Sequence, residues 1–231
     1  MKYLIITFFI LMASLTMQAQ NYELTYIASF DKEVMLDRLD KTEKELKEKS
    51  TTRRFFKEAQ PIEFKIIANS KAAYSYRESQ MESDHIKINI NNALYNENNK
   101  YYLNFTENEY VFKKRHSSKV YRVSFQPHEY EILSDKAKVI NGFNCRLALV
   151  KDENIKVWFT MDYPLNIGPK KYIGLPGLVV KVLENTMINY ELKSIKETKT
   201  QIKTFDPTQE VITEKEYKEM MDKMSQGLFE K

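Results

Sequence analysis

The feature that most constrains the fold is a series of short runs in which apolar and polar residues alternate. Tyrosine and phenylalanine, with 15 and 13 copies, concentrate in these runs. Alternation with a period of two is the signature of a β-strand that buries one face. Polar turns separate the runs at close intervals, which favours an antiparallel meander over alternating strand–helix units. The predicted strands are Tyr22–Ala28, Ile62–Ala68, Ala72–Arg77, His85–Ile90, Lys100–Phe105, Glu109–Lys113, Val120–Phe125, Ala137–Ile140, Cys145–Lys151, Ile155–Thr160, Leu178–Glu184 and Ile188–Ile195.

Two turns between these runs have recognisable chemistry. Asn141-Gly142 joins two apolar runs, and both residues tolerate the positive φ angles of a type I′ turn, which matches strand twist. The segment 97–99 (Glu-Asn-Asn) predicts a looser hairpin ahead of the run at Lys100. These turns support direct antiparallel pairing of neighbouring strands.

Two segments have helical patterns instead. Glu33–Ala59 is rich in Lys, Glu and Leu, which predicts one helix or two helices broken near residues 50–52. The segment 213–224 begins with Thr213, and Glu216 follows three residues later, which forms a capping box. It predicts a short C-terminal helix, although a weakly packed tail fits the same composition.

We therefore expect a mainly β (α+β) fold. It is a strongly bent antiparallel sheet or incomplete barrel, with one packed helical segment and a short C-terminal helix. A bent sheet buries one face around a helix, so we expect the helical segment on the concave side. Residues 20–231 are enough for one β-rich domain, which contains the helical segment 31–60 and the C-terminal helix or tail 205–231.

The first 19 residues have the pattern of a secretory signal peptide. Lys2 supplies a positive start, an apolar run follows, and Ala19 is a small residue suited to the cleavage position. The alternative is a membrane anchor, but the apolar run is short for about 30 Å of hydrocarbon. We expect cleavage after Ala19, a periplasmic or secreted mature protein, and no transmembrane segment in it.

Charge and cysteine usage narrow the function classes. Loss of Lys2 with the signal lowers the formal net charge from +4 to +3, and no basic stripe suggests nucleic acid as a partner. Cys145 is the only cysteine, so an exported chain has no internal disulfide framework. We interpret Cys145 as a buried, unreactive thiol, and the alternative is an exposed thiol that pairs with a partner.

Glycine and proline concentrate in one segment. The whole chain has five glycines and six prolines, and three of each fall within residues 164–177. Pro176 sets φ for the second position of a turn, and Gly177 is suited to the positive φ of a type II turn. The sequence therefore predicts a rigid loop between two core strands, which serves either recognition or architecture.

Candidate binding residues follow from this loop and the strand before it. Trp158 is either an anchor of the sheet or a residue that stacks on a ligand. Asp162 is either a turn-capping carboxylate or a candidate functional acid at the start of the loop. The hypothetical binding set is Trp158, Asp162, Gly168, Pro169, Gly174, Leu175, Pro176, Gly177 and Leu178.

The sequence offers no assembled catalytic or metal motif. His85, His116 and His128 have no metal-ligand spacing, and a single cysteine excludes a thiolate zinc site. No serine-hydrolase elbow and no phosphate-binding glycine loop are present. Lys113–Arg115 is a basic cluster that is either a solvated hairpin tip or a contact for an acidic partner or lipid headgroup. We predict no catalytic residues, no metal and no cofactor.

The Gly/Pro-rich segment and its surroundings also resemble a known family. The matching features are the signal end at Ala19, the runs Ile140–Cys145 (INGFNC) and Val157–Thr160 (VWFT), Gly168-Pro169, and Gly174–Val180 (GLPGLVV). Together they resemble the GLPGLI family of exported proteins, typical of Bacteroidetes and without an established function. More weakly, the layout resembles LolA-like periplasmic lipoprotein carriers, and such an analogy of fold does not transfer function.

These observations lead to three functional expectations. The first is a non-enzymatic exported binding or carrier protein for an apolar small molecule, lipid or peptide. The second is a structural or protein-interaction module that docks a cell-envelope partner through the Gly/Pro loop. The third, with the least support, is a hydrolase that uses Asp162 or a histidine.

Overall fold

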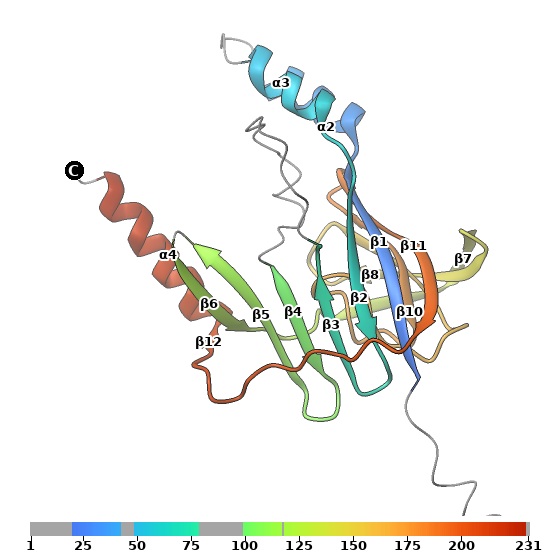
Figure 1. Ribbon diagram of the computed structural model, residues 1–231. Helices are drawn as coiled ribbons and strands as arrows, with labels where there is room; N and C mark the ends of the chain where they lie inside the picture. The colour runs from blue at the N-terminus through green and yellow to red at the C-terminus, as the bar shows by residue number, and fades with distance from the viewer. Residues whose placement is uncertain (1–19, 43–48, 79–98, 117, 230–231) are drawn as a thin grey trace, which may run out of the picture.

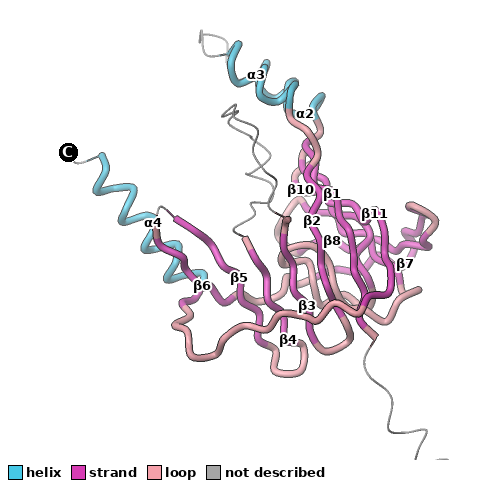
Figure 2. The backbone as a smooth tube through the Cα atoms, in the orientation of Figure 1, coloured by secondary structure: helices cyan, strands magenta, loops and turns pink. Residues whose placement is uncertain are grey.

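The computed structural model describes residues 20–42, 49–78, 99–116 and 118–229 (Figures 1 and 2). The described strands form one twelve-stranded sheet in the order β12-β6-β5-β4-β3-β2-β1-β11-β10-β9-β8-β7. Every pairing is antiparallel except that of β12 with β6. The strands are β1 Asn21–Phe30, β2 Ile62–Ala68, β3 Ala72–Tyr76, β4 Lys100–Asn104, β5 Glu109–His116, β6 Lys119–Ser124, β7 Tyr130–Ile140, β8 Phe143–Val150, β9 Ile155–Thr160, β10 Leu178–Glu184, β11 Ile188–Thr198 and β12 Ile212–Thr213.

The sheet is twisted and bent, and its alternating residues divide into two faces. Figure 1 shows β8 and β10 turning behind β1 and β2. The face that holds the main core, called the inner face below, carries Leu24, Tyr26, Phe64 and Tyr190, each at most 1% exposed. This arrangement confirms the mainly β, bent antiparallel fold that the period-two alternation predicts.

Most strand predictions agree with the structure, and the differences have local causes. Tyr130–Ile140 is one long strand, whereas the sequence predicts only its last four residues. Its first part contains Ser134, Asp135 and Lys136, and the register shifts there, so the apolar alternation is lost. β12 is too short to have an alternation of its own. The predicted strand 85–90 and the predicted hairpin 97–99 involve positions outside the described residues.

The type I′ hairpin is confirmed. Asn141 and Gly142 have φ angles of 51° and 84°, and Ile140 pairs directly with Phe143. The amide of Asn141 also donates to the carbonyl oxygen of Leu192 at 3.0 Å. The turn thereby fixes the β7–β8 register and ties it to β11.

The helical segment consists of α2 (Lys32–Thr42) and α3 (Lys49–Glu58). Asp31 caps α2 by accepting from the N–H of Val34 at 3.1 Å. The predicted break near residues 50–52 is wrong, because these residues lie inside α3. The placement on the concave side is also wrong: Figure 1 shows both helices beyond the ends of β1 and β2. Phe56 of α3 is buried, and its ring lies 5.8 Å from that of Phe30.

The C-terminal helix is confirmed as α4 (Glu214–Phe229). Its capping box forms as predicted: the hydroxyl of Thr213 accepts from the N–H of Glu216 at 3.2 Å, and the Glu216 carboxylate accepts from the N–H of Thr213 at 2.7 Å. The parallel pairing of β12 with β6 places the start of α4 beside the edge of the sheet that these two strands form. This position brings α4 residues to the pocket described below.

A loop, not a helix, covers the centre of the inner face. Residues 161–177 join β9 to β10 and carry a buried apolar set that belongs to the same core as Tyr26. This loop occupies the space in which the sequence pattern predicts a helix. Its buried members are Leu165, Ile167, Ile173 and Leu175, each at most 2% exposed.

Candidate functional site

The path of the loop 161–177 depends on two glycines that approach other backbone segments. A Cβ on Gly177 would overlap the carbonyl oxygen of Thr160 at the end of β9. A Cβ on Gly168 would meet the Tyr172 carbonyl oxygen and lie 2.7 Å from the Cβ of Val179. Neither position has room for a side chain, so close packing and not chain reversal explains these glycines.

The predicted type II turn at Pro176-Gly177 is wrong. A type II turn needs a positive φ at Gly177, but in this loop the positive φ angles belong to Gly174, at 88°, and Lys170, at 53°. The N–H of Gly177 donates instead to the carbonyl oxygen of Leu175 at 2.8 Å, which closes a three-residue turn. Tertiary contact with Thr160 selects this tighter turn.

The loop is anchored to the sheet by buried hydrogen bonds. The N–H of Val179 donates to the carbonyl oxygen of Ile167 at 2.8 Å. The hydroxyl of Tyr26 on β1 donates to the carbonyl oxygen of Val179 at 2.5 Å, and burial raises the pKa of Tyr26 well above its ordinary value. These bonds hold the loop in one position over the inner face.

The structure separates the residues of the predicted binding set. Trp158 alternates with the inner-face residue Val157, so it lies on the outer face, where the ammonium of Lys138 sits 4.1 Å from its ring centre. Asp162 is exposed and donates its N–H to the Thr160 hydroxyl at 3.2 Å. Gly174 and Pro176 are exposed, whereas the buried members are Gly168, Pro169, Leu175, Gly177 and Leu178.

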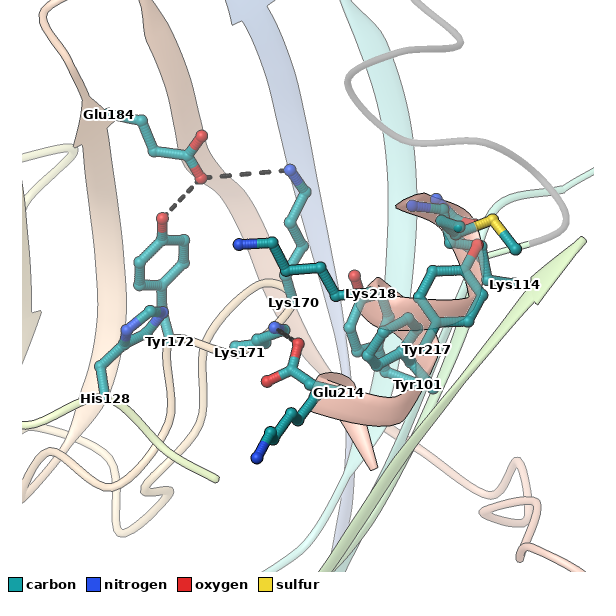
Figure 3. A pocket seen from close by; sticks show the side chains of 14 residues that line it. Tyr101, Lys114, His128, Lys170, Lys171, Tyr172, Glu184, Glu214, Tyr217 and Lys218 are labelled. Atoms are coloured by element: carbon teal, nitrogen blue, oxygen red, sulfur yellow. Dashed lines mark hydrogen bonds and ion pairs between the residues drawn. The ribbon is translucent and has the colours of Figure 1, made fainter. Parts of the chain in front are cut away.

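A pocket of about 870 Å³ lies beside these residues, yet it contains none of them. It opens between the middle of the loop, the inner-face side of β4 and β5, and the first turns of α4 (Figure 3). Its lining residues are Asn99, Tyr101, Phe112, Lys114, His128, Lys170, Lys171, Tyr172, Glu184, Glu214, Lys215, Tyr217, Lys218 and Met221.

Glu184 and two residues of the loop form a polar network at one side of the pocket. The Tyr172 hydroxyl donates to the Glu184 carboxylate at 2.5 Å, and the Lys170 ammonium lies 4.0 Å from the same oxygen (Figure 3). Lys170 also donates to the Tyr190 hydroxyl. Burial lowers the pKa of Lys170, and the nearby Lys171 and Lys114 lower it further, although Glu184 opposes this. Lys170 therefore lies close enough to Lys171 and Lys114 for their charges to act on it.

Burial also shifts the pKa values of two stacked rings at that network, His128 and Tyr172. The His128 ring stacks on the Tyr172 ring, with centres 5.1 Å apart and planes 18° apart. Burial lowers the pKa of His128, whereas the Glu153 carboxylate, 3.6 Å from its Nδ1, raises it. Burial and then Glu184 raise the pKa of Tyr172 well above its ordinary value. Near neutral pH, Tyr172 is a hydrogen-bond donor and His128 is mostly uncharged.

The opposite wall comes from α4 and strand β5. Lys171 pairs with Glu214 at the start of α4, which ties the loop to the helix. The Tyr217 ring packs against the Tyr121 ring at 5.6 Å, and the Lys114 ammonium lies 5.5 Å from the Tyr217 ring centre. Five lysines and two glutamates line the described pocket, which gives it a formal charge of +3 when His128 is neutral.

The residues considered for metal and thiol chemistry lie as follows. Within the described residues, no group of three or more His, Cys, Asp or Glu side chains is placed to hold a metal ion. Cys145 is 1% exposed and burial raises its pKa to about 11, so the prediction of a buried thiol is confirmed. His116 lies exposed at the end of β5, and His85 lies outside the described residues.

Sequence reasoning missed most of the pocket. It considered His128 as a histidine without metal-ligand spacing and Lys113–Arg115 as a basic cluster, and both His128 and Lys114 of that cluster line the pocket. Lys170, Lys171 and Tyr172 lie inside the Gly/Pro-rich loop, but the glycines and prolines drew attention away from them. The available signal was two adjacent lysines and a tyrosine directly after Gly168-Pro169.

A family model matches residues 5–181 and is described as "Protein of unknown function (Porph_ging)". The chain belongs to this family. The Porph_ging match includes the loop 161–177, whereas Glu184 and all of α4 lie beyond it. Part of the pocket is therefore built by residues outside the matched region. No curated protein matches the chain.

Solved structures give a likeness of fold. Two structures of PNGF-II match at TM-scores of 0.52 and 0.54, with 19% and 20% identity. Each match covers 87% of this chain but only 32% and 33% of the respective PNGF-II chain, so this chain spans about a third of that length. Identity this low shows the fold alone.

A third match is a putative outer membrane lipoprotein-sorting protein domain from Vibrio parahaemolyticus, at 7% identity and a TM-score of 0.32. It covers 79% of this chain and 87% of that domain, but a score at this level carries no argument. In the described part of this chain, no helix has the length and apolar character needed to cross a membrane.

Proposed function

We propose that this Porph_ging-family protein is a non-enzymatic, exported binding or carrier protein, and that its ligand occupies the pocket between the loop 161–177 and α4. The observation that carries the proposal is the pocket itself. Its volume of about 870 Å³ falls within the range of sites for small molecules. It also lies beside a loop whose path is fixed by buried contacts.

The apolar part of the lining supports a ligand with an apolar body. Tyr101 and Phe112 stand side by side on β4 and β5, with ring centres 5.6 Å apart. Tyr217 and Met221 face the same space from α4. Aromatic rings and methionine give a large contact area for an apolar chain, and methionine adapts to its shape. This lining fits the sequence-based expectation of an apolar small molecule or lipid.

The anchored loop supports binding through low reorganisation cost. Gly168 and Gly177 fit against backbone, and the Tyr26 hydroxyl holds the strand that follows. A site formed before the ligand arrives loses less conformational entropy on binding. Lys170–Tyr172 are presented from this fixed frame, so the polar side of the pocket is preorganised.

The proposal also includes export of the protein and its assignment to the GLPGLI type within the family. The signal-like residues 1–19 support a periplasmic or secreted location after cleavage at Ala19. The GLPGLVV run at Gly174–Val180 supports a GLPGLI-type, Bacteroidetes-like assignment within the family. A carrier in the cell envelope would then meet its apolar ligand outside the cytoplasm.

The two alternatives have less support. Docking through the Gly/Pro loop has only the exposed Asp162, Gly174 and Pro176 to offer, because the other signature residues are buried. The hydrolase alternative uses Asp162 or a histidine; Asp162 does not line the pocket, whereas His128 does, stacked on the Tyr172 ring. The titratable groups of the polar network, on the loop and on β10, are engaged with one another.

The test is uptake of a neutral, environment-sensitive dye, N-phenyl-1-naphthylamine, by the purified protein. We expect a saturable rise in fluorescence that Met221→Trp weakens, because the larger side chain narrows the pocket. Met224→Trp is the matched control, since Met224 is on the same helix but 39% exposed and outside the lining. A folded protein that takes up no dye, or equal loss in both variants, would overturn the proposal.

A further inference from the structure

Three of the five pocket lysines have no acidic partner among the residues that the structure describes. Lys170 pairs with Glu184, and Lys171 pairs with Glu214. Within the described ranges, no carboxylate lies within 4.0 Å of the ammonium groups of Lys114, Lys215 or Lys218, although all three line the pocket. The lining therefore presents positive charge that the described part of the protein does not neutralise.

Pocket lysines from three separate elements, two of them without a carboxylate partner among the described residues and one paired with Glu184, line this one space. Lys114 is on β5, Lys170 is in the loop, and Lys218 is one turn into α4. Figure 3 shows the Lys218 side chain reaching from α4 toward the side of the pocket where Lys170 and Glu184 lie. Like charges placed together repel one another unless an anion lies between them.

The carboxylates of the pocket do not supply that anion. Glu184 already accepts from the Tyr172 hydroxyl and faces the Lys170 ammonium. Glu214 is bound to Lys171. Both are therefore engaged with partners on the loop, and neither pairs with Lys114 or Lys218.

We propose that the ligand is an amphipathic anion, whose charged group lies among Lys114, Lys170 and Lys218 and whose apolar body lies against Phe112 and Met221. This inference rests on the proposed function, because it assumes that the pocket is the ligand site. Ammonium groups recognise carboxylate and phosphate by charge-assisted hydrogen bonds. A carboxylate headgroup and a phosphate headgroup share this chemistry.

The experiment is displacement of the neutral dye by matched ligands below their micelle-forming concentrations. Dodecanoate and dodecyl phosphate test the two headgroups, dodecanol has the same chain without charge, and dodecyltrimethylammonium has the opposite charge. A hydrogen bond to a charged group predicts that an anion displaces the dye at a concentration about tenfold lower than dodecanol does. Because Lys114 and Lys218 are exposed, we expect added salt to reduce this preference.

Charge reversal on α4 assigns the effect to the pocket. Lys218→Glu should remove the preference for anions and leave dodecanol displacement unchanged. Lys223→Glu is the matched control, because Lys223 is exposed on the same helix but outside the lining. An unchanged urea midpoint for both variants shows that folding is not the cause.

The outcomes separate the two proposals. Equal displacement by dodecanol and the two anions, or an anion preference that survives Lys218→Glu, overturns the amphipathic anion and leaves the carrier intact. A protein that binds neither dye nor amphipath overturns both. A preference for dodecyl phosphate over dodecanoate assigns a phosphorylated headgroup, and the reverse assigns a fatty-acid type.

Discussion

The two buried glycines of the loop 161–177 and the residues between them serve different purposes, although they lie only a few residues apart. Gly168 and Gly177 are buried against backbone. Between them, Lys170, Lys171 and Tyr172 line the pocket. The glycines fix where the chain runs, and the residues between them place charge and a phenolic hydroxyl on that fixed path.

This contrast shows that conspicuous residues need not carry the chemistry. Glycine is needed where backbone meets backbone, because no side chain fits there. Such contacts lie away from solvent and ligand, because backbone covers both sides. The candidate functional side chains are instead those that the loop backbone directs into the pocket, and their residue types are common in proteins.

The largest expected effect is on stability, through the packing of the loop against β9. Gly177→Ala places a methyl group on the Thr160 carbonyl oxygen, and overpacking against backbone should lower the free energy of unfolding by about 3 kcal/mol. Urea denaturation measures the change. The dye-binding pocket should be lost together with the fold of the loop.

Gly142→Ala is the control for this substitution. A Cβ on Gly142 would meet no atom within 4 Å beyond its chain neighbours, but the φ of 84° disfavours alanine. We expect a loss of about 1 kcal/mol from backbone strain alone. Equal losses in the two variants would contradict the role of close packing at Gly177.

A smaller effect is expected on the α4 wall of the pocket. Thr213→Ala removes the hydroxyl that caps α4, which costs about 1 kcal/mol of helix stability. Amide hydrogen exchange in the first turn of α4 should accelerate, while exchange in β1 and β10 stays the same. Thr213→Ser keeps the hydroxyl and should behave like the wild type. Faster exchange across the whole sheet would contradict this prediction, because it would show that α4 and the sheet unfold together.

The smallest expected effect is a pH dependence at His128. Burial holds its pKa below the ordinary value of 6.5, while Glu153 opposes the shift. Lys171 also lowers this pKa, whereas Glu184 and Glu214 raise it. Below pH 6.5 the unfolded chain binds the proton first, so the free energy of unfolding should fall as the solution is acidified.

His128→Phe tests this assignment. The ring still stacks on Tyr172 but cannot bind a proton, so the fall in stability just below pH 6.5 should become smaller. Urea denaturation at closely spaced pH values measures the slope. An unchanged slope would mean that other groups cause the acid sensitivity.

Local sequence was sufficient for much of the secondary structure. The β2 and β9 boundaries match the predicted ones at both ends, because each strand has a clear alternation and clear turns. The capping box at Thr213 and the hairpin at Asn141-Gly142 also formed as expected. In each case the deciding interactions lie within a few residues of one another.

Tertiary structure decided the rest. The conformation at Gly177 depends on Thr160, which belongs to another strand, so a local turn rule gave the wrong φ. The helices α2 and α3 lie beyond the sheet, whereas the loop packs against the core on the inner face. The pocket joins Lys114, Lys170 and Lys218, which are far apart in the chain, and no spacing in a sequence records such a meeting.

The sequence determined the strands and the rigid loop, since those depend on nearest neighbours. Only the folded sheet, by its bend and strand order, determined which charges share one space.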